Sequence, residues 1–273
     1  MRLLSTLTAS FIAIGAASSA TACGPYTVAL YEYGALYYKD PHDGRPRGVD
    51  LDVVNELARR SGCKLDTVLQ ARSRTWATFG DGQVDIATSA LQLPERETVA
   101  EFVPYFRSHY FVLMRSDLAA ALPTPEAFLA DPQRRLVVVR SFRFTPQLNH
   151  WIEELRARKR VDEAADQPAA VRSFVAGRVD AIVTGAGMLA LDSLREDGGA
   201  LQQGYVPIDW SPKDQAVAAL AISRKTVTPA DAALLRRTVE DMLRDGTMDA
   251  ILRRHVGETM ARLVRAQPVA TAR

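Results

Sequence analysis

Residues 85–97 contain the side-chain types of a carboxylate-binding site. They read Asp-Ile-Ala-Thr-Ser-Ala-Leu-Gln-Leu-Pro-Glu-Arg-Glu, which predicts a short apolar strand, a loop of small residues and a helix that begins at Pro94. The Arg96 guanidinium can hold a carboxylate through two parallel hydrogen bonds. Backbone N–H groups of the loop between Ala90 and Gln92 can contribute further hydrogen bonds to the same anion.

Arg96 also has a simpler interpretation, which is a solvated ion pair with Glu97 or Glu101 on the helix surface. Taken alone, the segment favours that interpretation. Other reactive groups show no competing pattern: the four histidines are scattered, and the chain has no Gly-x-Ser-x-Gly, His-Glu-x-x-His or paired Cys/His motif. We therefore expect no metal, no cofactor and no catalytic residue.

The elements that position this segment predict an α/β fold. Residues 26–31 and 65–69 read as strands, and residues 50–62 between them read as an amphipathic helix with an acidic start and a terminal glycine. Strand, helix and strand in this order form a right-handed parallel unit. The segment Phe79-Gly-Asp-Gly-Gln-Val-Asp-Ile-Ala-Thr is echoed by Phe174-Val-Ala-Gly-Arg-Val-Asp-Ala-Ile-Val-Thr, which indicates two lobes of similar construction.

Residues 1–22 have the features of a signal peptide. Arg2 provides a positive start, an apolar run follows, and Ala20-Thr21-Ala22 matches a small-residue cleavage site. We expect cleavage after Ala22 and a periplasmic protein. The formal net charge of the whole chain is only +2, and removal of Arg2 lowers it further, so charge gives no support for binding to nucleic acid or to a membrane surface.

The two cysteines of the chain each precede an expected strand. Cys23 comes just before the first and Cys63 just before the second, so parallel pairing of these strands would place both at one end of the sheet. In an oxidising compartment this arrangement predicts a disulfide. A lipidated Cys23 at the mature N-terminus is the alternative, but the preceding Ala-Thr-Ala lacks the large apolar residue typical of a lipobox.

With these motifs in order, the chain resembles family 3 of the periplasmic solute-binding proteins, the amino-acid receptors of ABC importers. The resemblance rests on Gly-Val-Asp-Leu-Asp from residue 48, Gly-Gln-Val-Asp-Ile from residue 82, Pro-Glu-Arg from residue 94, Gly-Arg-Val-Asp-Ala from residue 177 and Asp-Gly at 245–246. It implies a type II two-lobed fold, in which two mostly parallel sheets flanked by helices are joined by two crossing strands. The expected ranges are 23–108 with 219–257 for lobe 1, 109–218 for lobe 2 and 258–273 for a flexible tail.

The resemblance also assigns roles to residues of the cleft. Arg96 falls on the family's carboxylate-binding arginine, Ala90 on a backbone carbonyl that accepts the ligand ammonium, and Gln92 on a position that helps to hold the carboxylate. Gly185 stands where the family has an aspartate for the ammonium. The expected ligand set comprises Tyr31, Glu32, Arg72, Ala90, Gln92, Arg96, Ser141, Arg143 and Gly185.

Departures from the family pattern favour anions over zwitterions. Gly185 stands where the family has an acid. Arg72 falls near the position of an aromatic residue that usually stacks on the ligand. Arg143 lies in a loop that contacts the ligand in the family, and in the same loop Phe142 replaces a usual glycine. An unpaired ammonium in a closed cleft costs about 1–3 kcal/mol. Glu32 could rescue ammonium binding from the other side. Alternatively, Arg72, Arg74 and Arg143 face solvent and have no ligand role.

We therefore predict a monomeric binding protein that delivers a small carboxylate-bearing ligand to the membrane subunits of an ABC importer. A receptor that presents its liganded form to a membrane sensor is an alternative. The main alternative is an enzyme, because secreted cyclohexadienyl dehydratases resemble these proteins. Such chemistry needs a general acid near the leaving group, and Glu32 is the one candidate that we identify at the edge of the cleft.

Overall fold

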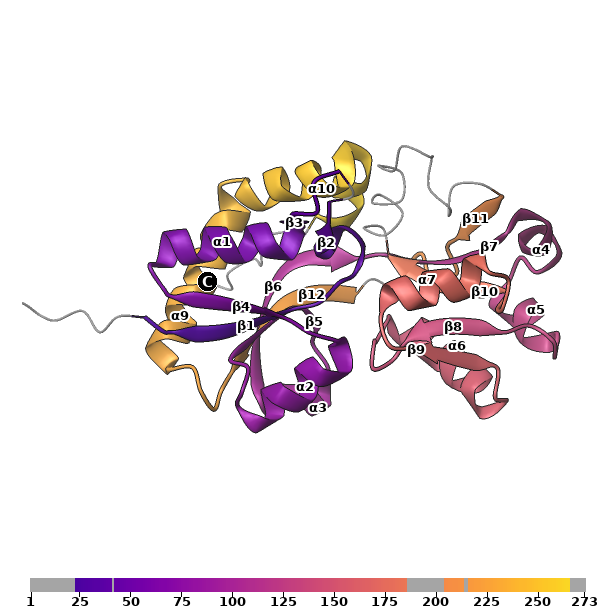
Figure 1. Ribbon diagram of the computed structural model, residues 1–273, viewed down its shortest axis with the longest axis horizontal. Coiled ribbons are helices and arrows are strands. Elements are labelled where there is room, and N and C mark those ends of the chain that lie inside the picture. The colour runs from indigo at the N-terminus through magenta and orange to yellow at the C-terminus, as the bar shows by residue number, and fades with distance from the viewer. Residues whose placement is uncertain (1–22, 41, 186–203, 214–215, 266–273) are drawn as a thin grey trace, which may run out of the picture.

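The computed structural model describes residues 23–40, 42–185, 204–213 and 216–265 (Figure 1). The expected signal peptide and the last residues of the expected tail lie outside these ranges. The described chain forms two five-stranded sheets, each flanked by helices, which confirms the two-lobed α/β prediction. No helix in the described part of the chain is both long enough and apolar enough to cross a membrane.

The sheet of lobe 1 has the strand order β4-β1-β5-β12-β6. β4 and β5 pair with β1 in parallel, and β12 then pairs antiparallel with both β5 and β6. Helices α1, α9 and α10 lie on one side of this sheet, and α2 and α3 lie on the other (Figure 1). The elements of this lobe are β1 (Tyr26–Leu30), η1 (Gly34–Leu36), β2 (Tyr38–Lys39), β3 (Pro46–Arg47), α1 (Val49–Ser61), β4 (Leu65–Leu69), α2 (Arg72–Asp81), β5 (Ile86–Leu91), α3 (Pro94–Glu97), β6 (Ala100–Ser108), β12 (Ala216–Ser223), α9 (Pro229–Arg244) and α10 (Thr247–Val264).

The sheet of lobe 2 has the order β11-β7-β10-β8-β9, in which β8, β9 and β10 are parallel. Its elements are β7 (Tyr110–Arg115), α4 (Ser116–Ala121), α5 (Pro125–Ala130), β8 (Leu136–Val139), α6 (Pro146–Ala157), β9 (Val161–Ala164), α7 (Gln167–Val175), β10 (Ala181–Gly185) and β11 (Tyr205–Ile208). The chain enters this lobe from β6 through His109 and returns along β12. β12 begins at Ala216, before the expected boundary at residue 219.

Local sequence explains both ends of α1. α1 has Asp50 and Asp52 in its first turn and Arg59 and Arg60 in its last, which complements the helix dipole, and Gly62 ends it in the left-handed conformation. The C-terminal end differs from expectation. α10 is kinked at Gly257, whose φ of 73° is not helical, and a further helical segment extends to Val264, past the expected start of the flexible tail at residue 258. Ala261 and Val264 of this segment are buried.

The Cys23–Cys63 disulfide is present, as the sequence predicts, and it closes a loop with a sequence separation of 40. We expect its removal in a Cys23→Ser/Cys63→Ser double variant to lower the free energy of unfolding by about 4 kcal/mol, from the chain-entropy cost of a loop of this length. Denaturant unfolding of oxidised wild type and of the variant measures the difference. A difference near zero would show that the bridge does not restrict the unfolded chain.

Candidate functional site

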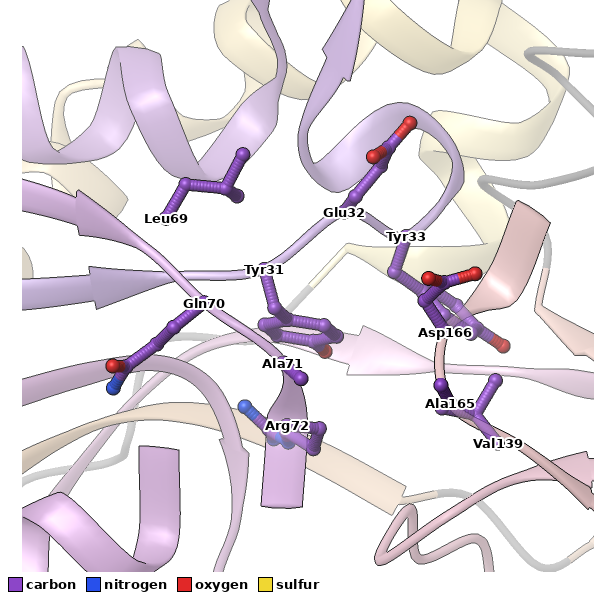
Figure 2. Close-up of a pocket in the computed structure, with 10 residues that line it drawn as sticks. All are labelled: Tyr31, Glu32, Tyr33, Leu69, Gln70, Ala71, Arg72, Val139, Ala165 and Asp166. Atoms are coloured by element: carbon purple, nitrogen blue, oxygen red, sulfur yellow. The ribbon is translucent and has the colours of Figure 1, made fainter. Parts of the chain in front are cut away.

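The two lobes face each other with the carboxyl ends of their parallel strands, the usual position of ligand sites in α/β proteins. A cavity of about 170 Å³ lies there (Figure 2). Its walls come from the segments that follow β1 and β4 in lobe 1 and from β8 and the segment after β9 in lobe 2. The lining residues are Tyr31, Glu32, Tyr33, Leu69, Gln70, Ala71, Arg72, Val139, Ala165 and Asp166. Three of the expected ligand residues, Tyr31, Glu32 and Arg72, therefore meet at one cavity.

Arg72 is buried at the first position of α2, with 5% of its surface exposed. Its guanidinium lies 4.2 Å from the centre of the Tyr31 ring and donates hydrogen bonds to the backbone carbonyls of Thr88 (3.0 Å) and Ser89 (2.7 Å). Figure 2 shows Arg72 beneath Tyr31, while Glu32 extends away from both. The solvated alternative is wrong for Arg72, although Arg74 is exposed on the same helix.

A buried carboxylate that the sequence analysis missed compensates the charge of Arg72. Asp50, fully buried at the start of α1, accepts hydrogen bonds from Ser89 Oγ (2.8 Å) and from Tyr105 Oη (2.5 Å). The Ser89 backbone N–H in turn donates to Tyr105 Oη (2.7 Å). Burial raises the pKa of Asp50, and these hydrogen bonds together with the positive charge of Arg72 oppose that rise.

Arg96 has no acidic partner in an ion pair within the described chain, although it is half-buried. Its guanidinium stacks on Trp76, 3.7 Å from the ring centre, and Nη1 makes a long hydrogen bond of 3.4 Å to the Leu91 carbonyl. Burial, followed by repulsion from Arg72, lowers the pKa of Arg96 to about 9; Arg143 repels it as well. A bound anion would stabilise the charged guanidinium, and none of its described neighbours does so fully.

The loop beside Arg96 differs from expectation. β5 continues through Leu91 with all its residues buried, and Ala90 pairs with Ala219 of β12, so the free loop expected at Ala90 is part of a sheet. Gln92 is exposed and donates from Nε2 to Glu97 Oε1 (2.8 Å) on the outside of α3. α3 is a single helical turn. The structure therefore leaves Arg96 near the cleft without the expected cradle of backbone amides.

The expected residues of lobe 2 fall on two segments. Ser141 and Arg143 lie in the turn after β8, where Arg143 is exposed and donates from Nη1 to the Phe142 carbonyl (3.2 Å). Gly185 is buried at the end of β10, where an added Cβ atom would lie 3.5 Å from the Tyr33 ring and hydroxyl of lobe 1. An alanine Cβ here would therefore make only ordinary van der Waals contact with Tyr33 across the cleft.

The residues that the structure describes include no ligand set of the kind that proteins use to bind a metal ion, and the acids of the cavity lie at its outer edge. No group of three His, Cys, Asp or Glu side chains there could hold a metal ion. The acids that line the cavity are Glu32 and Asp166, which are exposed, and Asp166 caps α7 by accepting the Ala169 N–H. The cavity is therefore cationic at its base, apolar or aromatic on its walls and acidic at its outer edge.

Sequence comparison identifies the family to which these features belong. The family model for bacterial extracellular solute-binding proteins, family 3, matches residues 28–258. The chain belongs to this family. Membership implies a periplasmic or extracellular location and agrees with the resemblance found in the motifs. No curated protein matches the chain significantly.

Solved structures with the same fold are numerous. An ancestral amino-acid-binding protein, described as a precursor of cyclohexadienyl dehydratase, has a TM-score of 0.70 at 20% identity, covering 85% of this chain and 95% of that one. An ancestral arginine-binding protein bound to glutamine has a TM-score of 0.69 at 19% identity, with 85% and 98% covered. A substrate-binding protein of an amino-acid ABC transporter from Streptococcus pneumoniae, bound to L-arginine, has a TM-score of 0.70 at 15% identity, with 86% and 95% covered. Identities this low establish the shared fold alone.

Proposed function

We propose that this protein captures a small carboxylate-bearing ligand and presents it to the membrane subunits of an ABC importer. The observation that carries the proposal is Arg96, a cation partly withdrawn from water beside a second arginine, with no acidic partner among the described residues. Arg72 adds positive charge at the base of the cavity. A carboxylate near both guanidiniums would relieve their mutual repulsion and form charge-assisted hydrogen bonds.

The edge of the cavity narrows the class of carboxylate. Glu32 and Asp166 would repel a second carboxylate that extended outward, so the site favours monocarboxylates over the polycarboxylates expected from the arginines alone. Gly185 places no acid at the inner side of the cleft, so an ammonium group directed inward would have no partner there, whereas one directed outward would meet Glu32 and Asp166. The favoured ligand is therefore a monocarboxylate without an inward-directed ammonium group.

We expect monocarboxylates to raise the melting temperature of the purified mature protein more than the matching amides do, and we expect no chemical turnover. Differential scanning fluorimetry with matched acids and amides, followed by calorimetry on the hits, measures the first expectation. Equal effects of acid and amide would contradict the proposed carboxylate site.

The enzyme alternative is tested on the same sample. Prephenate and arogenate are incubated with the protein, and their consumption is followed by chromatography. Glu32→Gln and Asp166→Asn are the informative variants, because these two acids line the cavity. Consumption by wild type that either variant abolishes would replace the binding proposal with a dehydratase.

A further inference from the structure

Aromatic rings from both lobes meet in the cleft. Tyr33 of lobe 1 and Phe142 of lobe 2 are stacked, with ring centroids 4.7 Å apart and an interplanar angle of 19°. Phe142 also contacts Tyr31 (6.3 Å), Tyr110 (6.2 Å) and Phe144 (4.9 Å). The Phe142 side chain, 8% exposed, thus occupies a space whose walls are aromatic on several sides.

Phe142 also forms a wall of a second, smaller cavity. This space of about 30 Å³ shares Tyr31 and Tyr33 with the larger cavity and reaches Ser89 and Gly185. Withdrawal of the Phe142 ring would enlarge it by about the volume of a phenyl group. The enlarged space would lie beside Arg72, whose guanidinium is 6.0 Å from the centre of the Phe142 ring.

A buried hydroxyl in the same place has at most a poorly aligned contact with the Gly185 backbone. Tyr33 is 6% exposed and its hydroxyl lies against Gly185, but it forms no hydrogen bond of normal geometry with any described residue. A buried polar group without a partner carries a desolvation cost that a suitable ligand atom would remove. The cleft therefore offers a polar contact at the end of an aromatic surface.

The segment that carries Phe142 is fixed on either side of that residue, since Arg140 N–H donates to the Ala164 carbonyl (2.9 Å) and Phe144 N–H donates to Asn149 Oδ1 (2.9 Å). It is a turn after β8, closed by the Phe142 N–H, which donates to the Val139 carbonyl (3.1 Å). Ser141 in this turn has φ +61°, in the left-handed region that non-glycine residues seldom adopt. The next residue, Arg143, is exposed. The backbone of this turn is thus anchored, whereas the Phe142 side chain packs against rings whose contacts another ring can replace.

We propose that the ligand is an aromatic monocarboxylate whose ring takes the place of Phe142 against Tyr33. Its carboxylate would face Arg72 and Arg96, and a polar ring substituent could reach the Tyr33 hydroxyl. The carboxylate part rests on the proposed function, whereas the ring site rests on the aromatic contacts alone. In the unliganded protein, Phe142 fills the ring site as a substitute for the ligand.

The first experiment compares four probes on wild type by calorimetry: benzoate, 4-hydroxybenzoate, cyclohexanecarboxylate and propionate. We expect the two aromatic acids to bind about three- to tenfold more tightly than cyclohexanecarboxylate, the range expected from stacking in addition to area burial. Propionate should bind more weakly still. If cyclohexanecarboxylate or propionate binds as tightly as benzoate, the ring site is wrong and the carboxylate site stands.

The second experiment removes the internal competitor. Phe142→Ala should bind benzoate about tenfold more tightly than wild type does, because no ring must be displaced and aromatic molecules fill apolar cavities of this kind. Phe174→Ala is the matched control: it removes a buried ring of lobe 2 that belongs to a separate core cluster, and no gain in benzoate affinity is expected. Phe142→Leu provides a second measurement if the alanine variant fails to fold.

A neutral ring separates the two proposals. Benzyl alcohol has no carboxylate and should raise the melting temperature of Phe142→Ala more than that of wild type. If it does so while no carboxylate binds any variant, the proposed function fails and the ring site remains. If neither benzyl alcohol nor benzoate distinguishes Phe142→Ala from wild type, the ring site is overturned.

Discussion

Replacement of Arg96 by methionine is expected to weaken binding of a monocarboxylate by about 2–5 kcal/mol, the usual cost of removing one partner of a desolvated charge pair. The ligand-free protein should keep its stability. The variant loses the contact between the guanidinium and Trp76, which stabilises the protein by about 0.5–1 kcal/mol. This loss is offset because the variant no longer carries a charge that burial and repulsion from Arg72 both disfavour. Calorimetry and denaturant unfolding measure the two effects separately.

Arg74→Met is the matched control, because Arg74 is exposed on α2 within a turn of Arg72 and carries the same charge. It should leave both affinity and stability within about 0.5 kcal/mol of wild type. Equal loss of affinity in both variants would indicate a general effect of net charge and not a contact. Full affinity of the Arg96 variant would remove Arg96 from the site and leave Arg72 as the candidate cation.

The sequence predicted the architecture well because local patterns determine it. The helix over 50–62 and the strands on either side of it could be read from periodicity, acidic starts and glycine ends, and the structure places them almost as expected. The same reasoning predicted the Cys23–Cys63 disulfide, because both cysteines precede strands that were expected to pair in parallel. The structure confirms both the bridge and the pairing. These predictions needed only neighbours in the chain and the rule for parallel connections.

The site was less predictable because distant contacts form it. The pattern of residues 85–97 suggested a free loop at Ala90, but β12, far along the chain, pairs with this segment and extends β5. Tyr33 and Phe142 meet only when the two lobes come together. The spacing of residues in the sequence does not predict this contact. The one indication was Phe142 itself, because it stands where the family usually has a glycine and so adds a ring to the cleft.

Asp50 shows the same limit most clearly. An aspartate in the first turn of a helix suggests a solvated charge that complements the helix dipole. Its complete burial depends on Tyr105 of β6 and Ser89 of β5, which approach it from other parts of the lobe. Asp50 therefore belongs to a buried network that links α1 to the carbonyl groups held by Arg72.

Asp50→Ala is expected to lower the free energy of unfolding by about 3–5 kcal/mol, because it leaves Tyr105 and Ser89 without their buried acceptor and Arg72 without its compensating charge. Asp50→Asn retains a carbonyl acceptor and should cost less. Asp66→Asn, on an exposed residue of β4, is the control and should change stability by less than about 0.5 kcal/mol. Denaturant unfolding at neutral pH measures all three.

The pH dependence of the stability of wild type and of Asp50→Asn tests the charge of Asp50. Burial raises the pKa of Asp50 in the folded state above 3.8. As the pH falls, the folded protein therefore binds a proton at Asp50 at a higher pH than the unfolded chain does. Protonation of Asp50 therefore favours folding, and the contribution is complete below pH 3.8 and is lost as the pH rises through the folded pKa. The stability of wild type relative to Asp50→Asn should consequently increase as the pH is lowered from 7 towards 4. A difference that stays constant or decreases over this range would mean that the hydrogen bonds and Arg72 outweigh burial, and that Asp50 is a stabilised carboxylate.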